Sequence, residues 1–238
     1  MAGRGSVRGV VLAGGDSRRF GRSDKALADL GGRPLLAHVV GAVDAATDCP
    51  PLLAVATHED GDRLTRALSN DGDRVEVVVD APSFEGPLAG IVVAASQTDR
   101  PWLLVCGCDM PLVSPATFET LRDDAGPDVD AVVPVVDGHD QPLHALYRRE
   151  AVVAGVAGLD GRGPRALLEG LDSVQRVPAT EVDGPLATAV TNVNTREDLE
   201  RVRERVRTVN GDTTRRADDG TIGQVDSDKT GRVSDDSQ

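Results

Sequence analysis

A cluster of cations follows the first apolar run of the sequence. Residues 10–27 read VVLAGGDSRRFGRSDKAL, and after Gly14 and Gly15 four cations occur within eight residues: Arg18, Arg19, Arg22 and Lys25. Adjacent glycines let backbone N–H groups approach an anion without obstruction by a Cβ atom. These residue types predict a loop that binds a triphosphate; the alternative is a glycine turn followed by solvated arginines.

The spacing of the glycines separates this loop from two common phosphate-binding loops. A G-x-G-x-x-G pattern is absent because Gly14 and Gly15 are adjacent, and a Walker loop is absent because Phe20 stands five residues after Gly15. The chain has only two lysines beside 24 arginines, and the second, Lys229, lies near the C-terminal end. An ammonium group is a compact donor to phosphate oxygens, whereas guanidinium is a planar fork. Lys25 therefore favours the phosphate interpretation.

Two carboxylates come directly after apolar runs. Asp109 follows LLVCGC, and Asp80 ends VVVD. Mg²⁺ commonly binds one or two carboxylates together with substrate phosphates, so we expect Asp109 to hold this ion, with a turn or helix cap as the alternative role. The segment GPLAG, residues 86–90, opens a helix through glycines. An anion or a ring could approach there, and an ordinary strand-to-helix connection is the alternative.

Other polar residues carry weaker signals. Thr195 and Asp198 in TNVNTRED fit a helix capping box, which leaves the two preceding asparagines unexplained. His144 is expected to be a half-buried strand residue rather than a catalyst. Cys106 and Cys108 are too closely spaced for a usual zinc half-site, and we expect them to pack in the core.

Val-rich apolar runs alternate with amphipathic segments along most of the chain. We expect strands at Val7–Ala13, Leu52–Thr57, Val75–Asp80, Trp102–Cys108, Asp130–Val136, Leu143–Tyr147 and Val174–Pro178. We expect helices at Pro34–Ala46, Asp60–Ser69, Leu88–Ser96, Ser114–Asp124, Pro164–Glu169 and Thr195–Val206. This alternation predicts an α/β fold with a mainly parallel sheet covered on both faces. Ligands of such sheets bind beyond the carboxyl ends of the strands.

Composition limits the organisation and the partners of the chain. Its 238 residues allow one α/β domain with extensions: a flexible start over 1–6, a domain over 7–207 and a disordered acidic tail over 208–238, where apolar residues nearly vanish. A formal net charge of −13 argues against nucleic acid as a partner. We expect no membrane span and no secretory signal. The acidic, lysine-poor composition is typical of salt-accumulating cytoplasms, and three cysteines without disulfide spacing fit a cytoplasmic location.

In their order along the chain, these motifs resemble the molybdenum cofactor guanylyltransferase family, within the Rossmann-like nucleotidyltransferases. LAGGDSRRFGRSDKAL resembles the first family signature, and CDMP, GPLAG, PLHALYRR and NVNTREDL resemble later landmarks. The resemblance spans residues 7–206 and implies a three-layer α/β/α fold with a mainly parallel twisted sheet. CDMP and NVNT favour the guanylyl branch. The chain departs from the pattern at Phe20 and Arg196, where Met and Pro are usual, and at Ala54, where the family has an asparagine.

The resemblance also implies roles for individual residues. The backbone of the first loop would contact GTP at Leu12, Ala13, Gly14 and Gly15. Lys25 would contact the phosphates; beyond the family pattern, we infer Arg19 as a second phosphate contact. Asp80 would bind on the guanine side, and Asp109 would bind Mg²⁺ and GTP. Asn194 would face the metal or the acceptor.

The implied reaction transfers GMP from GTP to the terminal phosphate of molybdopterin, with or without its metal, and releases pyrophosphate. Mg²⁺ would be the cofactor, and proteins that insert molybdenum or accept the product would be partners. The acceptor phosphate is already anionic, so no protein base is required. Three alternatives stay open: a cytidylyltransferase for the same pterin, a sugar-phosphate nucleotidyltransferase, and a non-catalytic nucleotide-binding protein on the same fold.

Overall fold

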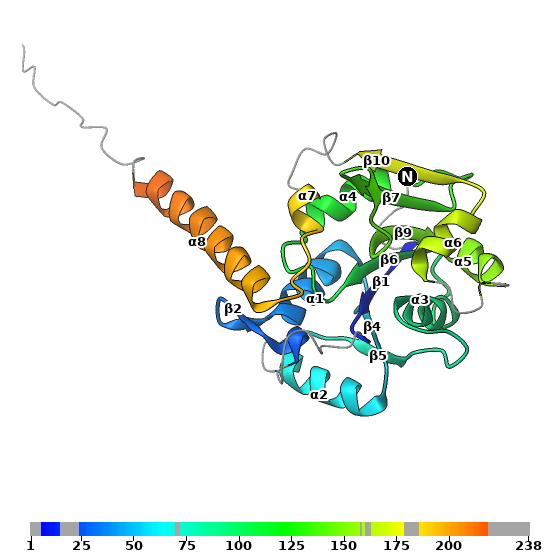
Figure 1. The fold of residues 1–238 in the computed structure, drawn as a ribbon, viewed down its shortest axis with the longest axis horizontal. Helices are drawn as coiled ribbons and strands as arrows, with labels where there is room; N and C mark the ends of the chain where they lie inside the picture. The colour runs from blue at the N-terminus through cyan, green and yellow to red at the C-terminus, as the bar shows by residue number, and fades with distance from the viewer. Residues whose placement is uncertain are drawn as a thin grey trace, which may run out of the picture. The chain divides into compact units, whose positions relative to one another are not determined.

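A mainly parallel sheet lies at the centre of the computed structural model (Figure 1), which describes residues 6–14, 24–69, 72–157, 159, 163–178 and 186–218. Its eight strands run in the order β10-β7-β9-β6-β1-β4-β5, with β8 paired to β7. The strands are β1 (Val7–Leu12), β4 (Leu52–Val55), β5 (Glu76–Val79), β6 (Trp102–Gly107), β7 (Ala131–Val136), β8 (His139–Asp140), β9 (His144–Arg148) and β10 (Val174–Pro178). All the strands expected from the sequence are present, within one or two residues of their predicted bounds.

The order of the strands creates a topological switch point between β1 and β6, where the connections of two neighbouring strands leave in opposite directions. Strand β1 pairs in parallel with both β4 and β6, and β4 pairs in parallel with β5. The chain therefore moves outward from β1 through β4 and β5, and then returns to the other side of β1 at β6. Strand β9 runs antiparallel to β6 and β7, whereas β10 is parallel to β7. In open α/β sheets a crevice forms at the carboxyl ends of two strands whose connections diverge, here β1 and β6.

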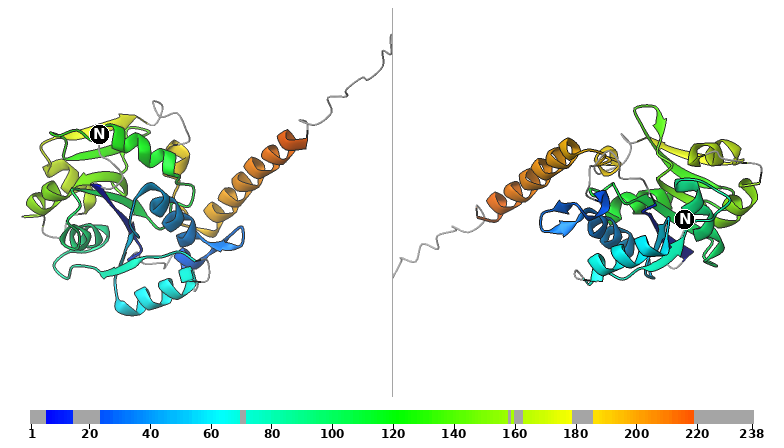
Figure 2. Two further views of the ribbon diagram at one scale, coloured as in Figure 1. Left: turned by 180° about the vertical axis from the view of Figure 1, so that it is seen from behind. Right: turned by 60° about the horizontal axis from the view of Figure 1, so that its bottom comes forward.

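Helices cover both faces of the sheet, as the predicted three-layer fold requires (Figures 1 and 2). One core joins the sheet to α1 (Leu35–Ala46), α2 (His58–Ser69) and α4 (Pro115–Asp123). The other core joins it to α3 (Pro87–Ser96), α5 (Arg149–Gly155) and α6 (Pro164–Gly170). Alternation along β1 serves both cores, because Val7 and Val11 face the first and Val10 and Leu12 face the second.

Several short elements lie outside the predictions. A hairpin joins β2 (Asp29–Leu30) to β3 (Arg33–Pro34), and a 3₁₀ turn, η3 (Lys25–Leu27), precedes it. Strand β8, helix α5 and the one-turn helix α7 (Leu186–Ala189) complete this set. Apart from α5, these elements contain two to four residues each, too few to show a helical or strand period, so the sequence pattern could not reveal them.

The last helix extends further than the sequence pattern predicts. Helix α8 spans Arg196–Asp218, so the first eleven residues of the expected disordered tail, 208–218, are helical. Leu199 and Val202 are buried and anchor the first turns of α8. The rest of the segment contains no proline, which would end a helix. Chain contacts define two units, Met1–Val202 and Arg203–Gln238. Within the described residues, none of the helices has the length and apolar character needed to cross a bilayer.

Candidate active site

The register of three parallel strands brings the predicted loops to one edge of the sheet. Leu12 at the end of β1 pairs with Ala54 of β4 and with Gly107 of β6. The next residues of each strand are held by backbone hydrogen bonds, in which Ala13 N donates to Ala54 O at 2.8 Å and Cys108 N donates to Leu12 O at 3.0 Å. The glycine loop and the Asp109 segment therefore leave the sheet side by side.

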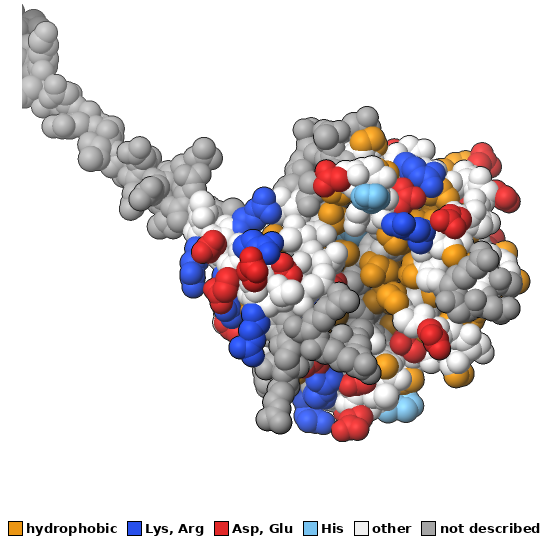
Figure 3. All heavy atoms as spheres, in the orientation of Figure 1, with side chains coloured by type: hydrophobic (Ala, Val, Ile, Leu, Met, Phe, Trp, Pro, Cys, Tyr) orange, Lys and Arg blue, Asp and Glu red, His pale blue; other side chains and the backbone are white. Residues whose placement is uncertain are grey.

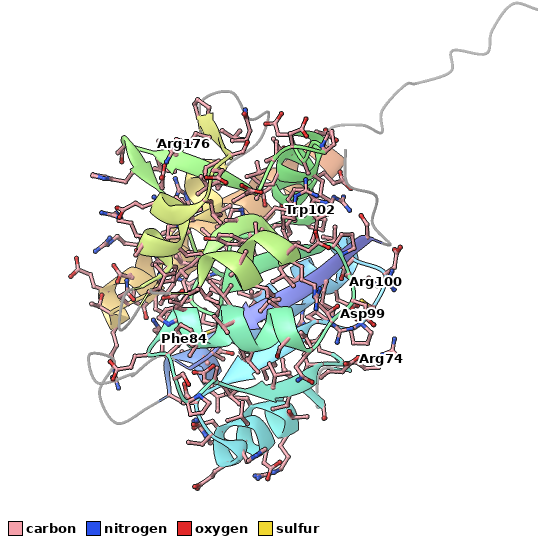
Figure 4. The ribbon with its side chains drawn as sticks, turned by 90° about the vertical axis from the view of Figure 1, so that its right-hand side faces the viewer. Arg74, Phe84, Asp99, Arg100, Trp102 and Arg176 are labelled. Atoms are coloured by element: carbon pink, nitrogen blue, oxygen red, sulfur yellow. The ribbon has the colours of Figure 1, made fainter. Side chains whose placement is uncertain are left out.

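Figure 4 shows the two ends of the sheet that this register defines. Phe84, in the connection that follows β5, lies at the carboxyl edge, and Trp102, the first residue of β6, lies at the opposite edge. The cleft opens at the carboxyl edge, and its lining residues are Leu12, Ala13, Gly14, Asp24, Lys25, Ala26, Ala54, Asp80, Gly86, Pro87, Gly90, Gly107, Cys108, Asp109 and Leu143. Figure 3 shows hydrophobic side chains gathered in the middle of the face seen there, with charged side chains around them.

An ammonium group bridges two oxygen ligands in this cleft. Lys25 Nζ donates to Asp109 Oδ2 at 2.9 Å and to Asn194 Oδ1 at 3.1 Å. The side chains of Lys25 and Asp109 are each 19% exposed, so both charges are largely removed from water. Each charge therefore compensates the loss of hydration of the other. The structure thus joins three predicted residues from distant parts of the sequence in one contact.

Asn194 reaches the cleft because its segment is fixed at both ends. Val193 N donates to Asp109 O at 2.8 Å, which ties the NVN segment to the end of β6. The carboxylate of Asp198 accepts hydrogen bonds from Asn194 N at 3.0 Å and from Thr195 N at 2.8 Å, and Asp198 N donates to Thr195 Oγ1 at 3.1 Å. The predicted capping box is therefore present, and it explains the asparagine before it: the cap holds Asn194 beside Asp109.

A second network holds the turn that carries Lys25. Asp24 is the N-cap of η3, and its Oδ1 accepts a hydrogen bond from Ala26 N at 2.9 Å. Oδ2 of Asp24 pairs with Arg63 of α2, which also donates to Asp60 at 2.6 Å. The sequence analysis did not identify Asp24 or Arg63, although an aspartate placed two residues before a backbone N–H is a known capping arrangement that could have indicated the first.

Asp80 lies in the part of the cleft formed by β4, β5 and α3. Its carboxylate stands between two glycines: a Cβ atom on Gly14 would lie 2.7 Å from Oδ2, and one on Gly90 would lie 3.3 Å from Oδ1. Burial raises the pKa of Asp80 to about 6, and no hydrogen bond from a described residue offsets this effect. Gly86, with φ +60°, is the N-cap of α3 and lines the same cleft.

Asp109 depends on a glycine in the same way. A Cβ atom on Gly107 would lie 2.7 Å from Asp109 Oδ1, so a side chain at the end of β6 would displace this carboxylate. The sequence analysis assigned no role to Gly107. Because glycine is otherwise unfavourable inside a strand, its presence as the last residue of an apolar strand was the available signal.

The remaining predicted residues lie in other positions. Gly15, Arg18, Arg19 and Arg22 fall in 15–23, outside the described residues. Cys106 packs in the core and Cys108 lines the cleft, where burial raises the pKa of its thiol to about 12. Among the residues that the structure describes, no group of three or more His, Cys, Asp and Glu side chains is arranged to hold a metal ion.

His144 is the first residue of strand β9, as expected from the sequence, but it is buried in the core rather than half-buried. Its side chain is fully buried, its ring stacks on Phe118 with 4.9 Å between centroids, and neither ring nitrogen has a hydrogen-bond partner among the described residues. Burial lowers the pKa of His144 to about 3. Helix α4 packs against β9 and covers the His144 ring. The alternation of residues along a short strand does not reveal that a helix from elsewhere in the chain buries this side chain.

Comparisons with known proteins agree with this architecture. The family model described as the MobA-like NTP transferase domain matches residues 9–177. The chain is 34% identical over 205 residues to a probable molybdenum cofactor guanylyltransferase of Natronomonas pharaonis, covering 85% of this chain and 99% of that protein. A protein of the same name from Bacillus cereus (strain AH820) is 32% identical over 194 residues, which cover 80% of this chain and 92% of that protein.

A solved structure shares the fold over nearly its whole length. Molybdopterin-guanine dinucleotide biosynthesis protein A from Archaeoglobus fulgidus superposes with a TM-score of 0.68 at 26% identity, covering 84% of this chain and 99% of that one. The family resemblance found in the sequence motifs is thereby confirmed. The chain belongs to the molybdenum cofactor guanylyltransferase family, which is built on the MobA-like NTP transferase domain.

Proposed function

We propose that this chain transfers GMP from GTP to the terminal phosphate of molybdopterin and releases pyrophosphate. The observation that carries the proposal is the contact of Lys25 with Asp109 and Asn194 at the switch point between β1 and β6. It places one cation and two oxygen ligands where a parallel sheet of this topology binds its ligands. The names of the relatives favour guanylyl transfer over the cytidylyl and sugar-phosphate alternatives.

GTP binds along the edge formed by β1, β4 and β5. Backbone groups of Leu12, Ala13 and Gly14 contact the nucleotide, and Asp80 accepts hydrogen bonds from N–H groups on the guanine side. Lys25 contacts the phosphates. Gly15 and Arg19, which belong to the same loop in sequence, complete the phosphate contacts. The small residues Ala54 and Gly90 leave room for a flat ring beside Asp80.

Two oxygen donors of the cleft fit a magnesium ion. The carboxylate of Asp109 and the amide oxygen of Asn194 are hard ligands, and both already lie within hydrogen-bond distance of one cation, Lys25 Nζ. Two protein ligands match the usual coordination of Mg²⁺, which takes its remaining ligands from phosphates and water. When bound there, Mg²⁺ would neutralise phosphate charge near the reacting phosphorus.

The reaction is an in-line substitution that needs no protein base. An anionic oxygen of the acceptor phosphate forms a bond to the α-phosphorus of GTP, and the bond from this phosphorus to the bridging oxygen breaks. The electron pair of that bond leaves with pyrophosphate. The chain contributes by orienting the two substrates and by offsetting negative charge with Lys25 and Arg19. His144 cannot serve as a base, because it is sealed in the core.

The acceptor approaches from the other side of the switch point. Cys108 and Leu143 line the cleft beyond Asp109, away from Asp80, and provide an apolar surface for a pterin ring. Proteins that insert molybdenum and proteins that take up the finished cofactor are the partners consistent with this product, and the cytoplasm is the corresponding location.

Nucleotide titrations followed by a product assay test this proposal. Calorimetric titration with GTP, CTP, UTP and ATP, in high salt with Mg²⁺, should show selective binding of GTP. Addition of molybdopterin to the GTP complex should then release pyrophosphate. Selective binding of CTP would transfer the proposal to the cytidylyl branch, and nucleotide binding without pyrophosphate release would support the non-catalytic alternative.

A further inference from the structure

We infer that Asp109 and Asn194 form a single cation site that the ammonium group of Lys25 and a divalent metal occupy in turn. In the nucleotide-free chain Lys25 fills the site. Nucleotide phosphates draw Lys25 out of it, and the vacated oxygens then take the metal. This inference rests on the proposed function, because it assigns an order of events to the same residues.

The contacts of Lys25 show that the ammonium group stands where a metal would. Its Nζ lies 2.9 Å from Asp109 Oδ2 and 3.1 Å from Asn194 Oδ1, so both oxygens point at one positive centre. With side-chain exposures of 19% each, Lys25 and Asp109 form a largely desolvated pair. A second cation cannot join the same oxygens at low cost, because two positive charges at that distance repel each other.

The main chain that carries the two oxygen ligands is held in place without the help of Lys25. The Asp109 main chain accepts a hydrogen bond from Val193 N at 2.8 Å, and the absence of a side chain at Gly107 leaves room for its carboxylate. The backbone of Asn194 is held by the Asp198 carboxylate at 3.0 Å. The main-chain positions of Asp109 and Asn194 therefore do not depend on the ammonium, as a metal site that forms after its departure requires.

Lys25 is the part of this contact that can move. Its side chain is a flexible stem of four carbons that ends in a compact charge, and it starts from a single 3₁₀ turn. A triphosphate offers the ammonium several anionic oxygens in place of one carboxylate. Once Lys25 turns to those oxygens, Asp109 lacks a counter-ion, and its affinity for a metal rises.

The exchange makes metal and nucleotide binding cooperative. A metal added alone must displace Lys25 while no triphosphate is present to receive the ammonium, so it binds weakly. A nucleotide added first removes this competition. Coupling between two ligands is reciprocal, and typical values lie between about 5-fold and 150-fold in affinity. Removal of the Lys25 charge should abolish the part of the coupling that comes from competition.

Mn²⁺ binding in the absence of nucleotide tests this inference directly, with the free ion followed by electron paramagnetic resonance in high salt. Lys25→Met should bind Mn²⁺ at least about 5-fold more tightly than the wild-type chain, although the same variant should bind GTP more weakly. Lys25→Arg keeps a cation beside the carboxylate and should retain the weak Mn²⁺ binding of the wild type. Asp109→Asn should abolish Mn²⁺ binding both in the wild-type chain and in the Lys25→Met variant.

Lys229→Met is a matched control, because it also removes one lysine charge from an acidic chain. Its Mn²⁺ affinity should equal that of the wild type. Equal or weaker Mn²⁺ binding by a folded Lys25→Met variant would overturn the inference, and so would an increase of the same size in Lys25→Arg or Lys229→Met. The test contains no nucleotide, so a failure of GTP selectivity would leave its result unchanged and would count only against the proposed function.

Discussion

The carboxylate of Asp80 lies so close to the backbone of Gly14 that a Cβ atom on the glycine would stand 2.7 Å from Oδ2. These residues follow different strands, β5 and β1, with β4 between them. Their contact makes the glycine loop and the carboxylate one unit. Ordinary Cβ atoms do not approach an oxygen this closely, so any side chain at position 14 must displace Asp80 or the loop.

Gly14→Ala should therefore weaken nucleotide binding with little effect on the fold. Displacement of a positioning group by about 1 Å can reduce the rate about 10²-fold, and we expect a loss of this order in turnover. Pyrophosphate release and calorimetric GTP titration measure it. Gly41→Ala in α1 is the control, because a Cβ there has space; it should stabilise the helix by about 1 kcal/mol and leave GTP affinity unchanged.

Loss of either charge in the cleft should reduce turnover more than affinity. We expect Lys25→Ala and Asp109→Ala to lower turnover by on the order of 10²- to 10³-fold, because each removes a preorganised electrostatic group. Arg201→Ala removes an exposed ion pair on α8 and should leave turnover unchanged. Turnover close to wild type in both cleft variants would rule out the proposed mechanism.

The raised pKa of Asp80 predicts a pH-dependent affinity for GTP. Its carboxyl has a pKa of about 6 in the nucleotide-free chain, so it is protonated below this pH. A protonated oxygen no longer accepts a hydrogen bond from the base, and binding therefore favours the ionised form. GTP affinity should fall as the pH decreases below about 6 and level off above it. In Asp80→Asn the affinity should be lower at neutral pH, and the step near pH 6 should be absent.

His144 should make the fold sensitive to acid. The unfolded chain protonates this histidine near its ordinary pKa of 6.5, whereas the folded chain keeps it neutral down to about pH 3. Between these values the unfolded state binds more protons, so the free energy of unfolding falls as the pH decreases through this window. The slope from one such group is at most about 1.4 kcal/mol per pH unit.

Denaturant titrations at pH 7 and pH 5 of His144→Leu and the wild type measure this effect. The leucine variant should lose less stability on acidification than the wild type, because the buried ring and its orphaned nitrogens are gone. His58→Leu, at an exposed position at the start of α2, serves as the control. An identical pH dependence in His144→Leu and the wild type would contradict the assignment of this effect to His144.

The alternation of apolar runs was sufficient to predict the sheet and the helices that cover it. Strands such as β1 and β6 are buried on both faces, and their continuous Val and Leu runs are visible without any structure. The same reasoning placed Gly14, Asp80 and Asp109 at one edge, because the residues after parallel strands must emerge together. It missed α5, and it missed the β2–β3 hairpin, whose two-residue strands are too short to show a period.

The sequence by itself determined which chemistry was available: a glycine loop, one lysine in a chain that otherwise uses arginine, and carboxylates at strand ends. Only the tertiary structure decided how these groups combine. Asn194 meets Lys25 across 169 positions of sequence, and the meeting depends on the hydrogen bond from Val193 N to Asp109 O. The pKa of Asp80 and the isolation of His144 come from burial by segments remote in the chain. Residue spacing encodes local geometry, whereas distances, desolvation and charge pairing arise when distant segments pack together.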